Sequence, residues 1–223
     1  MAQMKTPGVY IIEKNAFPNS VVEVATAIPA FIGHTQFARD GNKDLTGIPF
    51  RISSMAEFHS FFGFAPTLRF GIRPEDSESE DTTNDINVLF PDGSCQLTLP
   101  KTFYALYYNM LLFYANGGGP CYIVSVGDYE HDFKSIDFTN ALLALKKEQE
   151  PTLVVVPEAV YMEEGDCYKV QTAALMHCGN DMKNRFAILD VFNGYKDENG
   201  AVIKSFRENI GSNFLAYCAS YYP

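Results

Sequence analysis

The second half of the chain alternates helix-like and strand-like segments, and this alternation limits its fold more than any other feature. Between residues 101 and 223, each of four short apolar runs follows a segment with helical spacing or helix-capping residues. The runs are predicted as strands at 121–126, 153–156, 186–191 and 214–219. Fully apolar strands separated by helices form parallel sheets. The sequence therefore predicts an α/β fold, a mainly parallel sheet with helices on both faces.

The helices are predicted at 101–116, 137–150, about 166–182 and near 205–210. The first of them is apolar on opposite faces, because Leu106 and Met110 lie on one stripe while Tyr108 and Leu112 lie on the other. It must therefore be covered on both sides.

The three glycines at 117–119 form the clearest glycine cluster in the chain. A phosphate-binding loop needs a strand before the glycines and a helix after them, so that backbone amides and the helix dipole face the anion. The predicted order here is the reverse, helix and then strand. The pattern favours glycines that end a helix through positive backbone angles.

The beginning of the chain is predicted to be an arm. Residues 1–20 contain a short strand that starts at Val9, followed by a polar break at 15–20 that acts as a linker. Residues 21–36 then form a core strand segment. Such an arm either folds back onto its own sheet or adds to a sheet edge of another copy.

Residues 37–100 are predicted to be an inserted, irregular segment, followed by the α/β body at 101–223. A capping box at Ser54 and Glu57 indicates one short helix, which ends at Gly63. The acidic stretch 74–85 is predicted to be a solvated surface loop, because its like charges repel and it has little to bury. It lacks the ligand spacing and central glycine of a calcium loop.

Charge and composition exclude several functions. The net charge of −10 disfavours nucleic acids and anionic membranes, since phosphates would be repelled. No signal peptide and no apolar run of about 18 residues occurs, so synthesis in the cytoplasm without membrane insertion is expected. The five cysteines form no Cys-x-x-Cys pair and are expected to be buried, reduced side chains.

No catalytic or metal-binding motif is present. The four histidines lie in unrelated contexts, and no nucleophile elbow occurs. Asp190, at the end of a predicted strand, is the best single candidate for catalysis, although a carboxylate that closes a strand is the commoner role. The chain is predicted to be no enzyme and to need no cofactor or metal.

Several segments, in this order and spacing, resemble contractile tail sheath proteins, the family of bacteriophage tails, R-type pyocins and contractile injection systems. The segments are Thr6-Pro7-Gly8-Val9-Tyr10-Ile11, residues 24–35 (VATAIPAFIGHT), residues 113–124 (FYANGGGPCYIV), residues 186–190 (FAILD) and residues 219–223 (ASYYP). Family members usually continue beyond the last of these, so the chain is expected to be the N-terminal part of a sheath subunit or a natural short form.

The resemblance implies a structural subunit that assembles in stacked hexameric rings around an inner tube and contracts to drive the tube through a target envelope. Its partners would be other sheath subunits, the inner tube protein, and baseplate and terminator proteins. The subunit would be made in the bacterial cytoplasm. By the same resemblance, the residues that link neighbouring subunits by strand addition would be Val9, Tyr10, Ile11 and Ile12.

Two other classes of function stay open. An α/β enzyme that binds a nucleotide or metabolite would need a concave site at the strand ends. A standalone binding module would be a stable monomer whose arm folds back.

Overall fold

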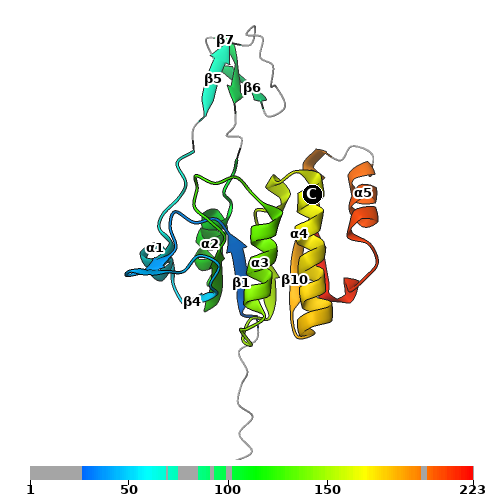
Figure 1. The fold of residues 1–223 in the computed structure, drawn as a ribbon. Coiled ribbons are helices and arrows are strands. Elements are labelled where there is room, and N and C mark those ends of the chain that lie inside the picture. The colour runs from blue at the N-terminus through cyan, green and yellow to red at the C-terminus, as the bar shows by residue number, and fades with distance from the viewer. Residues whose placement is uncertain are drawn as a thin grey trace, which may run out of the picture.

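The computed structural model describes residues 27–68, 70–74, 85–90, 93–98, 102–196 and 200–222. Its centre is a six-stranded sheet (Figure 1). Five neighbouring strands are parallel, and the sixth, at one edge, is antiparallel. In spatial order the strands are β11 (Cys218–Tyr221), β10 (Phe186–Asp190), β9 (Leu153–Val155), β1 (Pro29–Gly33), β8 (Cys121–Ser125) and the antiparallel β4 (Phe50–Ile52).

The α/β fold with a mainly parallel sheet, predicted from the sequence, is confirmed. Helices follow the strands in the expected alternation: α2 (Leu106–Ala115), α3 (Ser135–Leu145), α4 (Glu164–Met176) and α5 (Ala201–Ile210). The chain passes from β1 to β8 in one direction along the sheet and then returns past β1 to β9 and onward. The direction of winding therefore reverses between β1 and β9.

The helices cover the two faces of the sheet unequally. On one face, α3 and α4 pack over the sheet around a large cluster that includes Ile32, Val124, Val154 and Leu189 (Figure 1). On the other face, α1 (Met55–Phe62) and α2 cover a smaller cluster of buried side chains from β1, β4 and β8. No residue of β10 or β11 belongs to this smaller cluster.

Part of the second face carries apolar side chains without a helix layer among the described residues. The register places Phe31, Val155, Ile188 and Ala219 side by side on this face. Phe31 is buried beside α2, whereas the side chains on β9, β10 and β11 are only partly buried. Parallel sheets normally have both faces covered. The half-covered face is therefore an apolar surface that the described residues leave open.

The inserted segment contains more regular structure than its sequence suggested. A small hairpin, β2 (Arg39–Asp40) and β3 (Lys43–Asp44), precedes β4. A three-stranded antiparallel sheet lies beyond the carboxyl ends of the central strands (Figure 1); its strands are β5 (Gly71–Pro74), β7 (Gly93–Thr98) and β6 (Asp85–Phe90). The acidic residues 75–84 lie outside the described residues.

The predicted N-cap is present at the start of α1, although Glu57 reaches back to the residue before the cap and not to the cap itself. The Ser54 hydroxyl accepts a hydrogen bond from the Glu57 amide at 3.2 Å, and the Glu57 carboxylate accepts one from the Ser53 amide at 2.6 Å. Gly63 ends the helix with φ +86°. These contacts follow from the short polar side chains at the helix start and from the positive backbone angle that only glycine adopts without strain.

Several element boundaries differ from the predictions. Helix α2 begins at Leu106 rather than near residue 101, α3 ends at Leu145 rather than at 150, and α5 begins at Ala201 rather than near 205. The helix predicted at about 166–182 ends at Met182, but its last part, His177–Met182, is π-helical. The last strand begins at Cys218 rather than at Phe214, which has φ +60° and leads into a 3₁₀ turn at Leu215–Tyr217. A left-handed residue cannot lie within a strand, and apolar spacing alone does not reveal it.

Candidate functional site

The crevice at the carboxyl ends of β1 and β9 is the first place to look for a ligand site. In open α/β sheets, ligands bind where the direction of winding reverses, outside the carboxyl ends of the strands. Here His34 follows β1 directly, and Glu158 lies in the turn that follows β9. Both side chains are buried, with exposed fractions of 1% and 0%.

Glu158 fills this crevice with its own carboxylate. Its Oε2 accepts hydrogen bonds from the backbone amide of His34 at 2.9 Å and from His34 Nδ1 at 2.8 Å. Its Oε1 accepts a longer one, 3.4 Å, from the amide of Leu106, the first residue of α2. A helix N-terminus is where a doubly wound enzyme holds a phosphate. In this chain an internal carboxylate occupies that position.

The packing around Glu158 leaves little room for a second anion. A Cβ atom added to Gly33 would lie 2.9 Å from the Cβ of Leu106 and 3.1 Å from the Glu158 carboxyl group. Burial raises the pKa of Glu158, while the hydrogen bonds from His34 and Leu106 act in the opposite direction. The arrangement ties β1, α2 and the turn after β9 together, as a structural clamp does.

An open cavity of about 450 Å³ lies next to the clamp, lined by residues that follow β1 and β8. The Ser125 and Thr35 hydroxyls are 2.6 Å apart, and the Thr35 amide donates to the carbonyl oxygen of Gly127 at 3.0 Å. Asp128 pairs with His131 at 2.5 Å on the exposed rim. Most of the residues that line the cavity are polar or charged.

A second buried polar cluster lies near the C-terminal end of α3. Arg185, 2% exposed, donates to the carbonyl oxygen of Leu145 at 3.0 Å and also bonds the carbonyl oxygen of Glu148. Its Nη1 is 2.8 Å from His177 Nε2. Burial and the Arg185 charge lower the pKa of His177 to about 4, so this imidazole is neutral and accepts the hydrogen bond. The cluster satisfies the last carbonyls of a helix and is structural.

Asp190, the candidate for catalysis, ends β10 as predicted. Its backbone carbonyl accepts a hydrogen bond from Gln171 Nε2 at 2.8 Å, and desolvation raises the pKa of its carboxyl group. Among the described residues, no group of three or more His, Cys, Asp or Glu side chains could hold a metal ion. All five cysteines are free, and Cys121, Cys167 and Cys178 are buried. None of the described helices is long and apolar enough to cross a membrane.

The glycine cluster ends a helix, as the sequence analysis favoured. Gly117 has φ +82°, and its amide donates to the Tyr114 carbonyl at 3.1 Å. The Gly118 amide donates to the Phe113 carbonyl at 2.9 Å. This pair of bonds is the Schellman arrangement that closes a helix C-terminus.

The proposed inter-subunit residues, Val9, Tyr10, Ile11 and Ile12, lie outside the described residues. The pairing of His34 with Glu158 was not predicted from the sequence. Both residues follow strands that belong to one parallel sheet, so a common position at its carboxyl edge was the available signal. Their separation of 124 positions hid the contact.

Comparisons with known proteins give matches only among solved structures. No protein-family model and no curated protein sequence matches this chain. Among solved structures, a chain of the contracted anti-feeding prophage baseplate, determined by cryo-electron microscopy, has a similar fold with a TM-score of 0.55 and 19% sequence identity. The match covers 99% of this chain and 48% of the baseplate chain, so this chain spans about half the length of its structural neighbour.

Proposed function

We propose that this chain is a structural subunit of a contractile tail sheath, which assembles as stacked hexameric rings around an inner tube and contracts to drive the tube through a target envelope. The observation that carries the proposal is the fold similarity to a chain of the anti-feeding prophage baseplate over 99% of this sequence. The sequence resemblance at 24–35 and 113–124 covers β1, the end of α2 and β8, which belong to the shared core.

The filled crevice supports a role in assembly over one in catalysis. A doubly wound enzyme keeps the crevice at the switch point open for its ligand. In this chain Glu158 occupies it, with three protein donors within 3.4 Å. The free energy for contraction would then be stored in subunit interfaces when the sheath is built, and no nucleotide would be hydrolysed.

The arm would link neighbouring subunits by strand addition. Strand β11 pairs only with β10 among the described strands, so one long side of the central sheet is an open edge. An extended segment with residues Val9 to Ile12 has the β-branched and aromatic side chains that suit an added strand. Main-chain hydrogen bonds would hold the lattice while subunits rotate. The partners would be other sheath subunits, the inner tube, and baseplate and terminator proteins.

Deletion of residues 1–15 tests this proposal. The truncated protein should keep the melting temperature of the intact chain within about 2 °C, because the lost hydrogen bonds are intermolecular, while sheath assembly should be abolished. Ile11→Pro should act in the same direction, since proline cannot donate to a ladder, and Ile11→Val is the matched control. Assembly that proceeds normally without the arm would refute strand donation.

The enzyme alternative has its own test. A thermal-shift screen with nucleotides and small metabolites should produce no stabilisation, because the crevice has no room for a phosphate beside Glu158. A saturable rise in melting temperature that Glu158 variants abolish would favour the enzyme.

A further inference from the structure

A small cavity lies at the carboxyl ends of β9 and β10, where α4 passes the two strands. Its walls are mostly apolar and include Val156, Val160 and Ile188. Gln171 of α4 and Asp190 of β10 are the polar residues in its lining. The cavity therefore combines apolar walls with two polar side chains from different elements.

Gln171 places a buried hydrogen-bond acceptor at this cavity. The residue is 2% exposed, and its Nε2 donates to the carbonyl oxygen of Asp190 at 2.8 Å. A carbonyl oxygen only accepts, so the contact fixes which end of the side-chain amide faces the strand, and Oε1 is the other end. Oε1 is buried and accepts no hydrogen bond from the described residues. A buried amide oxygen without a donor is costly, so the position favours a ligand that supplies one.

Asp190 adds a carboxylate that has no cationic partner among the described residues. Desolvation raises the pKa of its carboxyl group, so apolar surface surrounds part of the side chain. None of the ion pairs between described residues includes Asp190. A positive charge within roughly 4–6 Å stabilises the ionised form of such a carboxylate. The ligand that suits both polar residues is a cation that donates hydrogen bonds.

The size of the cavity selects among such cations. It measures about 10 Å³. One water-sized group needs roughly 10–15 Å³. A primary ammonium group is a compact charge of this size, whereas a guanidinium group is a larger plane. Tyr161, which follows Val160 and is 47% exposed, lies close enough to Asp190 that burial and the carboxylate charge together raise the pKa of the tyrosine. Val160 and the Tyr161 ring can cover the methylene groups of a lysine side chain.

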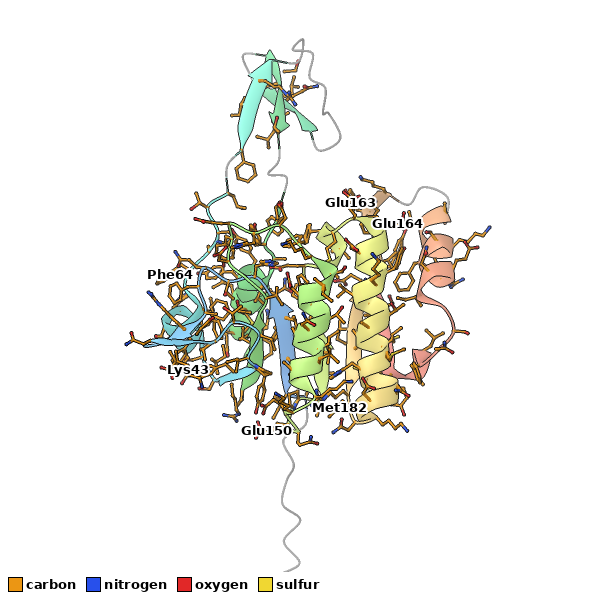
Figure 2. The ribbon with its side chains drawn as sticks, viewed as in Figure 1. Lys43, Phe64, Glu150, Glu163, Glu164 and Met182 are labelled. Carbon is orange, nitrogen blue, oxygen red and sulfur yellow. The ribbon has the colours of Figure 1, made fainter. Side chains whose placement is uncertain are left out.

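We propose that this cavity receives the ammonium group of a lysine side chain that a neighbouring protein of the assembled particle presents. The ammonium donates to Gln171 Oε1 and to the Asp190 carboxylate, and the methylene groups lie against the apolar walls. Charge complementarity favours a basic partner, since the chain has a net charge of −10 and Figure 2 shows Glu163 and Glu164 at the same end of the molecule. The nature of the partner rests on the proposed function, and the ligand chemistry rests on the cavity alone.

Titration of the intact chain with acetyl-Gly-Lys-Gly-amide, followed by NMR, tests the cavity. The peptide should shift the side-chain amide resonances of Gln171 in a saturable way, because a new donor reaches Oε1. A peptide with norleucine in place of lysine keeps the apolar stem without the ammonium, and it should leave these resonances unchanged. The arginine peptide should shift them less than the lysine peptide. An absence of saturation with lysine, or equal shifts with norleucine, would overturn the proposal.

Two single-charge variants provide the matched comparison. Asp190→Asn should weaken binding of the lysine peptide by about tenfold, and its exposed position at the end of β10 should allow the fold to be retained. Glu150→Gln also removes one charge from a half-exposed side chain, and Figure 2 shows Glu150 at the opposite end of the molecule from Glu163. This control should change the affinity by less than about twofold. Equal weakening by both variants would show that net charge, not the cavity, binds the peptide, and would overturn the proposal.

The outcome separates the lysine cavity from the proposed function. If sheaths assemble and the lysine peptide does not bind, the cavity assignment is wrong and the sheath assignment stands. If the peptide binds at Gln171 and no particle forms under any condition, the cavity assignment stands and the sheath assignment is wrong.

Discussion

Replacing Glu158 by alanine should remove the clamp at the switch point and destabilise the whole fold. The carboxylate is fully buried and accepts hydrogen bonds from the His34 amide, His34 Nδ1 and the Leu106 amide. Removing one partner of such a buried arrangement leaves the others without acceptors, at a cost of about 3–5 kcal/mol. For a chain of this length the expected fall in melting temperature is roughly 6–20 °C.

The assay is urea unfolding at pH 7, followed by circular dichroism, with Glu163→Ala as the control. Glu163 is exposed just before α4 and should change the free energy of unfolding by less than about 1 kcal/mol. Glu158→Gln keeps one acceptor oxygen and should fall between the two. A Glu158→Ala protein within about 1 kcal/mol of the wild type would refute the clamp, and with it the argument that this crevice is filled for structural reasons.

Three further outcomes are expected. Gly118→Ala should destabilise the protein by about 1–3 kcal/mol, because the added Cβ would lie 2.5 Å from the ring of Phe113 in α2. Gly119→Ala should be nearly neutral, since no atom lies within 4 Å of the Cβ that it adds. Equal melting temperatures for the two variants would contradict this. The folded-state pKa of His177, about 4, lies below its unfolded value of about 6.5. The contribution of the neutral imidazole to the free energy of unfolding is therefore complete above pH 6.5 and is lost as the pH falls towards 4. Urea unfolding should show a loss of about 2 kcal/mol between pH 7.5 and 5, and His177→Gln should reduce that loss. Ile188→Thr, on the open sheet face, should lower the free energy of unfolding by under about 1.5 kcal/mol and should reduce self-association in sedimentation experiments. Leu189→Thr, on the packed face, should lower it by about 2–4 kcal/mol. A larger loss for Ile188→Thr than for Leu189→Thr would mean that the two faces are assigned wrongly.

The alternation of apolar runs and helical spacing was enough to predict the central sheet. The strands at 121–126, 153–156 and 186–191 agree with β8, β9 and β10 to within one residue, because each run is short, apolar and bounded by glycine, proline or charged residues. The last strand was displaced by several residues, since the left-handed turn at Phe214 has no sequence signal in an apolar context.

The inserted segment was harder to predict because its strands bury little. In the sequences of β6 and β7, polar residues alternate with apolar ones, and among the described strands β5, β6 and β7 pair only within their own three-stranded sheet. Strand β4 was missed for a different reason: it has only three residues, and it joins the central sheet through long-range pairing with β8. Local spacing does not encode such contacts.

The candidate site was missed for a related reason. His34 and Glu158 are single polar residues after apolar strands, and each alone has the pattern of a capping residue. Their pairing depends on β1 and β9 being neighbours, which follows from the order in which the strands wind and not from any local motif. The sequence around Glu158 also contains no lysine or arginine that would have indicated a buried partner for its carboxylate.

Electron microscopy of the protein, produced alone and together with a candidate inner tube protein, tests the proposed role as a sheath subunit most directly. A sheath subunit should give stacked hexameric rings that enclose a tube, with the fold of the described residues fitting each subunit density, and no such rings after deletion of residues 1–15. Monodisperse monomers under both conditions, with no density for this fold in any particle, would contradict it.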